Sequence, residues 1–256
     1  MTYYYAVFHR PLGSMSEPAE RQTFPFTFDR YGELLDAIRA ADYEFRSFHD
    51  PPAAGGILLR HDVDLSVVSA LRMAQAEANR DIVSTYHVLL SSPLYNPFEA
   101  VTRDRIREIE ALGHNVALHF STHAYWDEEP SQSALAERIY GELRALESVV
   151  ADDLPPTVSF HIPPDWILDR ALPNVRSTYA PRYFSDIGYV ADSGQRWREE
   201  PPDVDALPDR VQMLVHPGLW GASDEGFEDR VERAIETAAS RARDGAQAEF
   251  IQGVYS

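Results

Sequence analysis

The chain has 256 residues, a length that suits one α/β domain, and it contains no cysteine, which excludes disulfides and thiolate metal sites. A net charge of −18 argues against nucleic acid as a partner. All 23 basic residues are arginine and the acidic residues are scattered, so we interpret the acidity as halophilic adaptation to a salty cytoplasm rather than as a surface that binds cations.

The N-terminal sequence lacks a basic region followed by an apolar stretch, and no later run is long enough to span a membrane. We therefore expect a cytoplasmic protein with no membrane span. The sequence leaves its oligomeric state open.

The first part of the chain leads up to one strand. Residues 1–27 are predicted to be an irregular N-terminal segment, and apolar residues at helical spacing then predict a helix over about 31–41. A loop rich in proline and glycine follows at 50–56. The apolar run at 57–59 begins a predicted strand that ends in Arg-His-Asp-Val-Asp at 60–64.

From residue 66 onward, predicted helices and strands alternate to the C-terminus. Helices are expected to begin near Ser66, Phe98, Leu135 and Phe227, and strands are expected at 82–90, 115–119, 157–161, 187–191 and 211–215. Strands that alternate with helices form parallel sheets. The order therefore predicts one domain over residues 1–256, built on a parallel sheet that is closed or nearly closed.

Two acidic residues end the strand at 57–64. Side chains alternate along a strand, so Asp62 and Asp64 point to one side and Val63 points to the other. Three interpretations are open at this point. The pair could hold a cation, it could do proton chemistry, or the strand could end there with both acids in water.

With this pair included, polar side chains lie at the C-terminal ends of five predicted strands. They are Asp62, Asp64, His119, His161, Asp192 and His216. In an α/β barrel these strand ends meet at the face where active sites are built. His119 and His123 form an HxxxH pair, and two histidines with one carboxylate are a recurrent catalytic set for zinc and also a set for non-haem iron. We predict a divalent metal site, with Zn²⁺ as the first choice.

Six short segments carry these residues in a fixed order. They are 59–64, 84–86, 113–123, 159–161, 192–194 with 197–199, and 214–217. Together they resemble the ordered motifs of the polysaccharide deacetylase family of carbohydrate esterases, which carry a chitooligosaccharide-deacetylase homology domain. The resemblance covers roughly residues 28–220.

This resemblance implies a distorted or incomplete (β/α) barrel of about seven parallel strands, with the site at the C-terminal ends of the strands. It also implies a metal-dependent hydrolase that removes N- or O-linked acyl groups from sugars. By the matching motif positions, Asp62 is the catalytic base and His216 the catalytic acid. The metal ligands are Asp64, His119 and His123.

Four further residues are predicted to support the site or to bind substrate. They are Arg60, His161, Asp192 and Trp197. Arg60 shares the acidic face of its strand and could neutralise Asp62. The sequence departs from the family pattern because Val63 separates two acids that are usually adjacent, and because His161 stands where arginine is usual.

The chemistry can also be argued from the residue types. A divalent ion polarises an acyl oxygen and lowers the pKa of its water, so Asp62 need only accept one proton. An amine leaves only when protonated, and His216 can hold that proton near neutral pH. Asp192 could bind the other ring nitrogen of His216 and keep the ring charged.

We therefore predict a cytoplasmic hydrolase that removes an acyl group, with N-acetyl as the first choice, from a carbohydrate or sugar-linked biosynthetic intermediate. Its partner would be a small-molecule or glycan substrate. Two alternatives stay open. One is a hydrolase of a non-sugar C–N bond of the ureide or formamide type, and the other is a catalytically idle barrel that binds a glycan or a metal.

Overall fold

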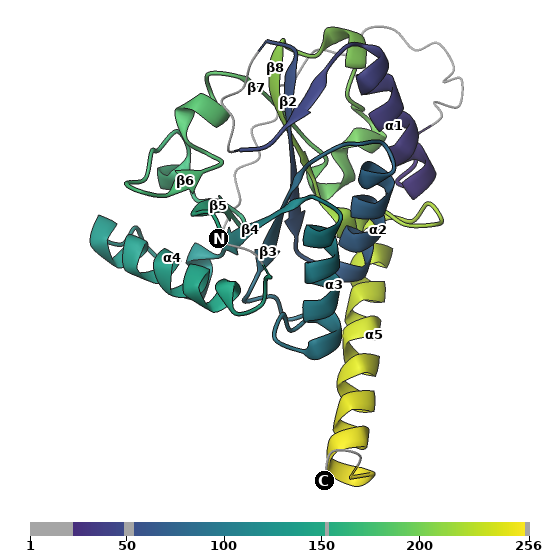
Figure 1. Cartoon of the computed structure of the whole chain (residues 1–256), viewed down its shortest axis with the longest axis vertical. Coiled ribbons are helices and arrows are strands. Elements are labelled where there is room, and N and C mark those ends of the chain that lie inside the picture. The colour runs from purple at the N-terminus through teal and green to yellow at the C-terminus, as the bar shows by residue number, and fades with distance from the viewer. Residues whose placement is uncertain (1–22, 49–53, 152–153, 254–256) are drawn as a thin grey trace, which may run out of the picture.

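The computed structural model describes residues 23–48, 54–151 and 154–253 (Figure 1). The predicted irregular segment at 1–27 therefore lies mostly outside the described residues, as does most of the predicted loop at 50–56. Among the described helices, none is both long and apolar enough to cross a lipid bilayer.

One parallel sheet organises the fold. Its strands are β1 (Glu44–Arg46), β2 (Gly56–Val63), β3 (Thr85–Leu89), β4 (Asn115–Phe120), β5 (Thr157–Phe160), β6 (Arg176–Ser177), β7 (Gly188–Ala191) and β8 (Arg210–Val215). The order is β6-β5-β4-β3-β2-β8-β7, with β1 paired to β2 as a side branch. Every strand pair is parallel. The end strands β6 and β7 do not pair in the described chain, so the predicted incomplete (β/α) barrel is confirmed.

Helices surround the curled sheet on its outer side (Figure 1). They are α1 (Phe28–Ala40), α2 (Val67–Ala78), α3 (Ala100–Ala111), α4 (Gln132–Glu147) and α5 (Phe227–Ala246), and α5 runs into a π-helical turn at Gln247–Ile251. Short 3₁₀ turns lie at Thr122–Ala124, Asp165–Ile167, Pro181–Tyr183, Ser193–Arg198, Val204–Ala206 and Pro217–Leu219.

Local sequence explains where these helices begin and end. The Ser66 hydroxyl accepts a hydrogen bond from the Ser69 amide at 3.1 Å, so it caps α2 directly after the two acids of the site. Gly113 follows α3 with a φ of +94°, a left-handed conformation that suits glycine and turns the chain into β4. The cap at Ser66 confirms the helix start predicted there.

The core lies on both sides of β2, all eight residues of which are buried. On the outer side, Leu59 joins a cluster with α1 and β8, and Val63 joins a cluster with the helices α2 to α4. On the inner side, Leu58 packs in a small cluster beside Tyr183, while Arg60 and Asp62 are buried farther along the strand. Alternation along β2 thus separates an outer face that is apolar except at His61 from an inner face that becomes polar toward its C-terminal end.

Candidate active site

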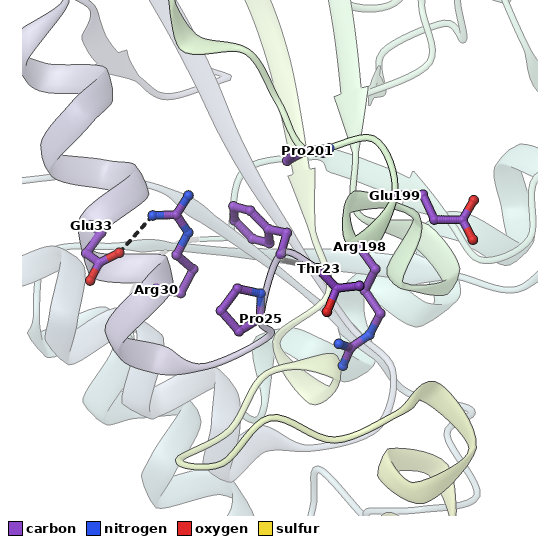
Figure 2. A pocket seen from close by; sticks show the side chains of 8 residues that line it. Thr23, Pro25, Arg30, Glu33, Arg198, Glu199 and Pro201 are labelled. Atoms are coloured by element: carbon purple, nitrogen blue, oxygen red, sulfur yellow. Dashed lines mark hydrogen bonds and ion pairs between the residues drawn. The ribbon is translucent and has the colours of Figure 1, made fainter. Parts of the chain in front are cut away.

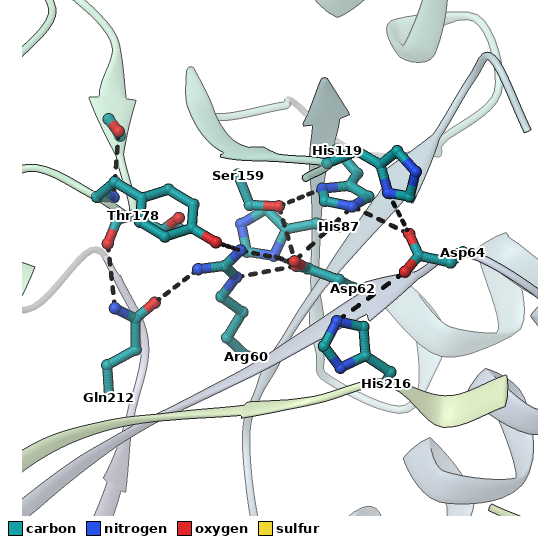
Figure 3. A network of polar contacts seen from close by, with 12 residues as sticks. Arg60, Asp62, Asp64, His87, His119, Ser159, Thr178, Gln212 and His216 are labelled. Atoms are coloured by element: carbon teal, nitrogen blue, oxygen red, sulfur yellow. Dashed lines mark hydrogen bonds and ion pairs between the residues drawn. The ribbon is translucent and has the colours of Figure 1, made fainter. Parts of the chain in front are cut away.

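Side chains from four strand ends meet at the C-terminal edge of the sheet (Figure 3). Asp62 lies in β2 and Asp64 follows one residue after its end, while His119 lies in β4. His161 and His216 come directly after β5 and β8. All five line one cavity of about 370 Å³. The structure therefore gathers these predicted site residues around a single space.

Asp62 is held by an arginine from its own strand. Arg60 donates from Nε to Asp62 Oδ1 at 2.9 Å and from Nη2 to Asp62 Oδ2 at 2.6 Å, and both side chains are buried (Figure 3). Burial alone raises the pKa of Asp62, but the guanidinium outweighs this and holds it well below its usual value. Gln212 accepts a further hydrogen bond from Arg60 at 3.2 Å. Asp62 is therefore a fixed carboxylate.

Asp64 is the centre of a group of possible metal ligands. Its Oδ1 lies 3.0 Å from Nε2 of His119 and 3.1 Å from Nδ1 of His161. One donor atom from each of these three residues lies within 4.8 Å of the other two. A carboxylate and two imidazoles that line an open cavity are a donor set that suits zinc and leaves room for a further ligand.

Ser159 decides which nitrogen of His119 carries the proton. Its hydroxyl lies 2.9 Å from Asp62 Oδ1 and 2.5 Å from His119 Nδ1. A carboxylate can only accept, so Ser159 donates to Asp62 and accepts from the Nδ1–H of His119. With Nδ1 directed at Ser159, Nε2 is the ring atom of His119 that faces Asp64 Oδ1. Two lone pairs at this distance repel each other, so the arrangement needs a proton or a cation between them.

His123, a ligand predicted from the sequence, lies apart from this group. It is exposed in the 3₁₀ turn at Thr122–Ala124, and its Nε2 is 2.9 Å from the carbonyl oxygen of Ile162. It lines a neighbouring cavity of about 810 Å³, which shares His161 and Ile162 with the first. The side chain that the structure brings to Asp64 and His119 is thus His161.

The surroundings of His216 favour the positively charged form of its ring. Its Nδ1 lies 2.6 Å from Asp192 Oδ1, and its backbone amide donates to both Asp192 oxygens at 3.0 Å. Trp220 Nε1 donates to Asp192 Oδ2 at 2.8 Å and so fixes that carboxylate. Burial alone lowers the pKa of His216, but the Asp192 carboxylate outweighs it and raises the value to about 9. The ring is therefore an imidazolium at neutral pH.

Trp197, predicted to support the site or bind substrate, lies in the core. It is 1% exposed and packs edge-on against Phe24 and Trp220. Two residues that sequence reasoning missed are Ser159 and Gln212. Each is a polar side chain between two apolar neighbours in its strand, and that interruption was the available signal.

A third cavity, of about 740 Å³, lies beside the start of α1 (Figure 2). Its two arginines are already neutralised, because Arg30 lies 2.8 Å from Glu33 and Arg198 lies 2.8 Å from Asp224. Among the described residues, its lining contains no histidine. The cavity with the Asp64 group is therefore the better candidate for chemistry.

Of the comparisons with known proteins, only the one with solved structures finds similar chains. No family model matches the chain, and no curated protein sequence matches it. The chain is similar to a family 4 carbohydrate esterase from Bacillus anthracis, with a TM-score of 0.43 and 12% identity over 81% of this chain and 86% of that one.

Two further solved structures resemble this chain with comparably low TM-scores and sequence identities. A family 4 acetyl xylan esterase from Clostridium thermocellum, solved with a cobalt ion, has a TM-score of 0.41 and 14% identity over 72% of this chain and 84% of that one. A peptidoglycan N-acetylglucosamine deacetylase has a TM-score of 0.44 and 12% identity over 79% and 90%. Because all these scores lie below 0.5, we argue the function from the geometry of the site.

Proposed function

We propose that the protein is a metal-dependent hydrolase that removes an acyl group from a sugar or sugar-linked substrate. Asp64, His119 and His161 would hold a divalent ion, with Zn²⁺ as the first choice. The observation that carries this proposal is the contact between His119 Nε2 and Asp64 Oδ1 at 3.0 Å. Ser159 occupies the other nitrogen, so Nε2 is free to bind a cation.

The bound ion would supply a polarised acyl oxygen and a water of lowered pKa. Asp62 is the proposed base, because it is the second carboxylate in the cavity wall and is not needed as a ligand. Arg60 keeps it ionised and oriented, so it can accept the proton that the water gives up as oxygen bonds to the acyl carbon.

His216 is the proposed acid. It stands on the other side of Asp64, with Nε2 at 3.9 Å from Asp64 Oδ2. Its charge, maintained by Asp192, allows it to give a proton to the departing amine or alcohol as the bond to the acyl carbon breaks. A base and an acid on two sides of one ligand group support a hydrolase over a barrel that only binds.

The side chains of the proposed ligand group must lose their protons before they bind a metal ion. Burial lowers the pKa of His161, but the nearby Asp64 carboxylate outweighs it and raises the value. A proton on His161 thus competes with the ion, and metal affinity is expected to fall as the pH is lowered.

The test is acetate release from N-acetylated sugars by the zinc-loaded protein, alongside a panel of ureides and formamides. We expect acetate release by the wild type, and a loss of at least about 100-fold in His119→Ala and in Asp62→Asn. Equal rates for wild type and His119→Ala would contradict the mechanism. Turnover of the ureides or formamides alone would move the substrate to the non-sugar class.

A further inference from the structure

The C-terminal helix α5 projects from the body of the molecule (Figure 1). It has 20 residues and is therefore about 30 Å long. One face meets the body, where Arg241 bonds to the Leu94 carbonyl and Glu99. Near the start of α5, Arg230 bonds to the Phe26 carbonyl. The remainder of the helix extends past the ends of α2 and α3 (Figure 1).

Between residues 235 and 246, the face of α5 that points away from these contacts is apolar. Its residues are Ile235, Ala239, Ala242 and Ala246, all exposed. Steps of four, three and four residues put them on one side of a helix, as in a coiled-coil seam. The seam continues into the π-helical turn, where Phe250 is 78% exposed and Ile251 is 79% exposed. Large apolar side chains left in water beyond the body indicate a surface that is covered in solution.

We propose that this seam binds α5 of a second copy of the chain, with the two helices antiparallel about a twofold axis between Ala239 and Ala242. In that register Ala239 of one copy faces Ala242 of the other, and Ile235 faces Ala246. Small side chains at the centre let the two helices approach closely, and each large side chain meets a small one.

The charges beside the seam favour a second copy over another partner. Glu236 and Arg243 are both exposed and lie on the same edge of the seam, seven residues apart. In an antiparallel pair this edge meets its own equivalent. Glu236 of each copy therefore faces Arg243 of the other, which gives two ion pairs related by the twofold axis. A surface that complements itself in this way suits an isologous dimer.

The first test is the mass of the full chain in solution by light scattering after gel filtration. It is run at physiological ionic strength, where a Debye length of about 8 Å screens the repulsion between two acidic chains. We expect twice the 28.9 kDa of one chain. The variant Ala239→Glu with Ala242→Glu places charges in the exposed seam and is expected to be a monomer with an unchanged circular dichroism spectrum. A monomeric wild type, or a dimer that survives these changes, would overturn the proposal.

The second test uses charge reversal. Glu236→Arg and Arg243→Glu should each weaken self-association by roughly tenfold, since both ion pairs become repulsive. When the two single variants are mixed they should form a heterodimer, because opposite charges then face each other again. Asp244→Arg makes the same charge change off the seam and should leave the dimer intact. Weakening by Asp244→Arg equal to that by Glu236→Arg, or no preference for the heterodimer, would contradict the antiparallel register.

Discussion

Asp192 controls the protonation of His216 through direct contact at 2.6 Å. In metal-free protein we expect the His216 ring to titrate with a pKa of about 9, followed by NMR of the ring protons. In Asp192→Asn the nearest counter-charge is lost while the burial stays, so this pKa should fall. An unchanged midpoint in the variant would show that Asp192 does not set the charge.

The same pair predicts two effects of pH. Activity should fall on the alkaline side as His216 loses its proton, and the alkaline limb of the kcat profile should move to lower pH in Asp192→Asn. Because the folded pKa is raised, the stability that His216 contributes is complete below its unfolded pKa and is lost as the pH rises through about 9. Urea unfolding between pH 6 and about 10 measures this loss.

Ile162 is strained beside the site. It has a φ of +46°, which is unfavourable for a β-branched residue, yet its side chain is 62% exposed. It follows His161 directly, and its carbonyl oxygen meets His123. We expect Ile162→Gly to stabilise the fold by about 1 kcal/mol, because relief of strain exceeds the added entropy of the unfolded chain.

Relief of this strain should also weaken metal binding, since a flexible residue 162 no longer fixes the ring of His161. Thermal unfolding and zinc titration of Ile162→Gly measure the two effects. A variant that is less stable than the wild type, with unchanged zinc affinity, would show that this backbone conformation has no role in the site.

At the residue level, side-chain alternation along one strand predicted correctly that Arg60 shares the face of Asp62. The second histidine of the proposed ligand group, His161, could not be predicted from spacing. HxxxH spacing brings two rings together only if the chain continues as a helix, whereas the chain makes a single 3₁₀ turn after β4. His161 reaches Asp64 because β5 pairs with β4, and such a neighbour is visible only when the strand order is known.

Helix α2 is tied to the sheet by one buried carboxylate. Glu77 is fully buried, 2.8 Å from His61 Nε2, and accepts hydrogen bonds of 2.5 Å from Tyr31 and Ser84. We expect Glu77→Ala to lower the free energy of unfolding by about 3 kcal/mol, because the variant leaves these polar groups buried without their partner. Glu33→Gln, which breaks an exposed pair with Arg30, should cost less than about 0.5 kcal/mol.

The stabilisation that Glu77 provides is expected to decrease in acid. Burial raises the pKa of Glu77, but its contacts with His61, His114 and Ser84 together outweigh burial and lower the value. The contribution of Glu77 is therefore present above its unfolded pKa and is lost as the pH falls through the lower folded pKa. The difference between wild type and Glu77→Ala in urea unfolding should shrink in acid. A difference that grows in acid would contradict this account.

At the level of elements, periodicity predicted the longer helices and the strands from β2 onward, because each buries one face over several residues. It missed β1 and β6, which have three and two residues. Strands this short show no alternation, and they form because β2 and β5 offer free edges. Their existence depends on the rest of the sheet rather than on local sequence.

At the level of the whole molecule, the charge of −18 predicts a strong effect of salt. Repulsion among the acidic residues destabilises the compact state, and salt screens it. We expect the melting temperature to rise by several degrees between about 0.1 M and 1 M NaCl. A melting temperature that stays constant or falls would count against halophilic adaptation.

The most direct measurement of the central claim is the zinc content of purified protein, compared across variants of the ligand group. We predict one equivalent of zinc in the wild type and in His123→Ala, and none in Asp64→Ala, His119→Ala or His161→Ala. Circular dichroism controls for folding. Zinc retained by folded His161→Ala but lost from His123→Ala would restore the ligand set predicted from the sequence, and zinc retained by Asp64→Ala would contradict the proposed centre.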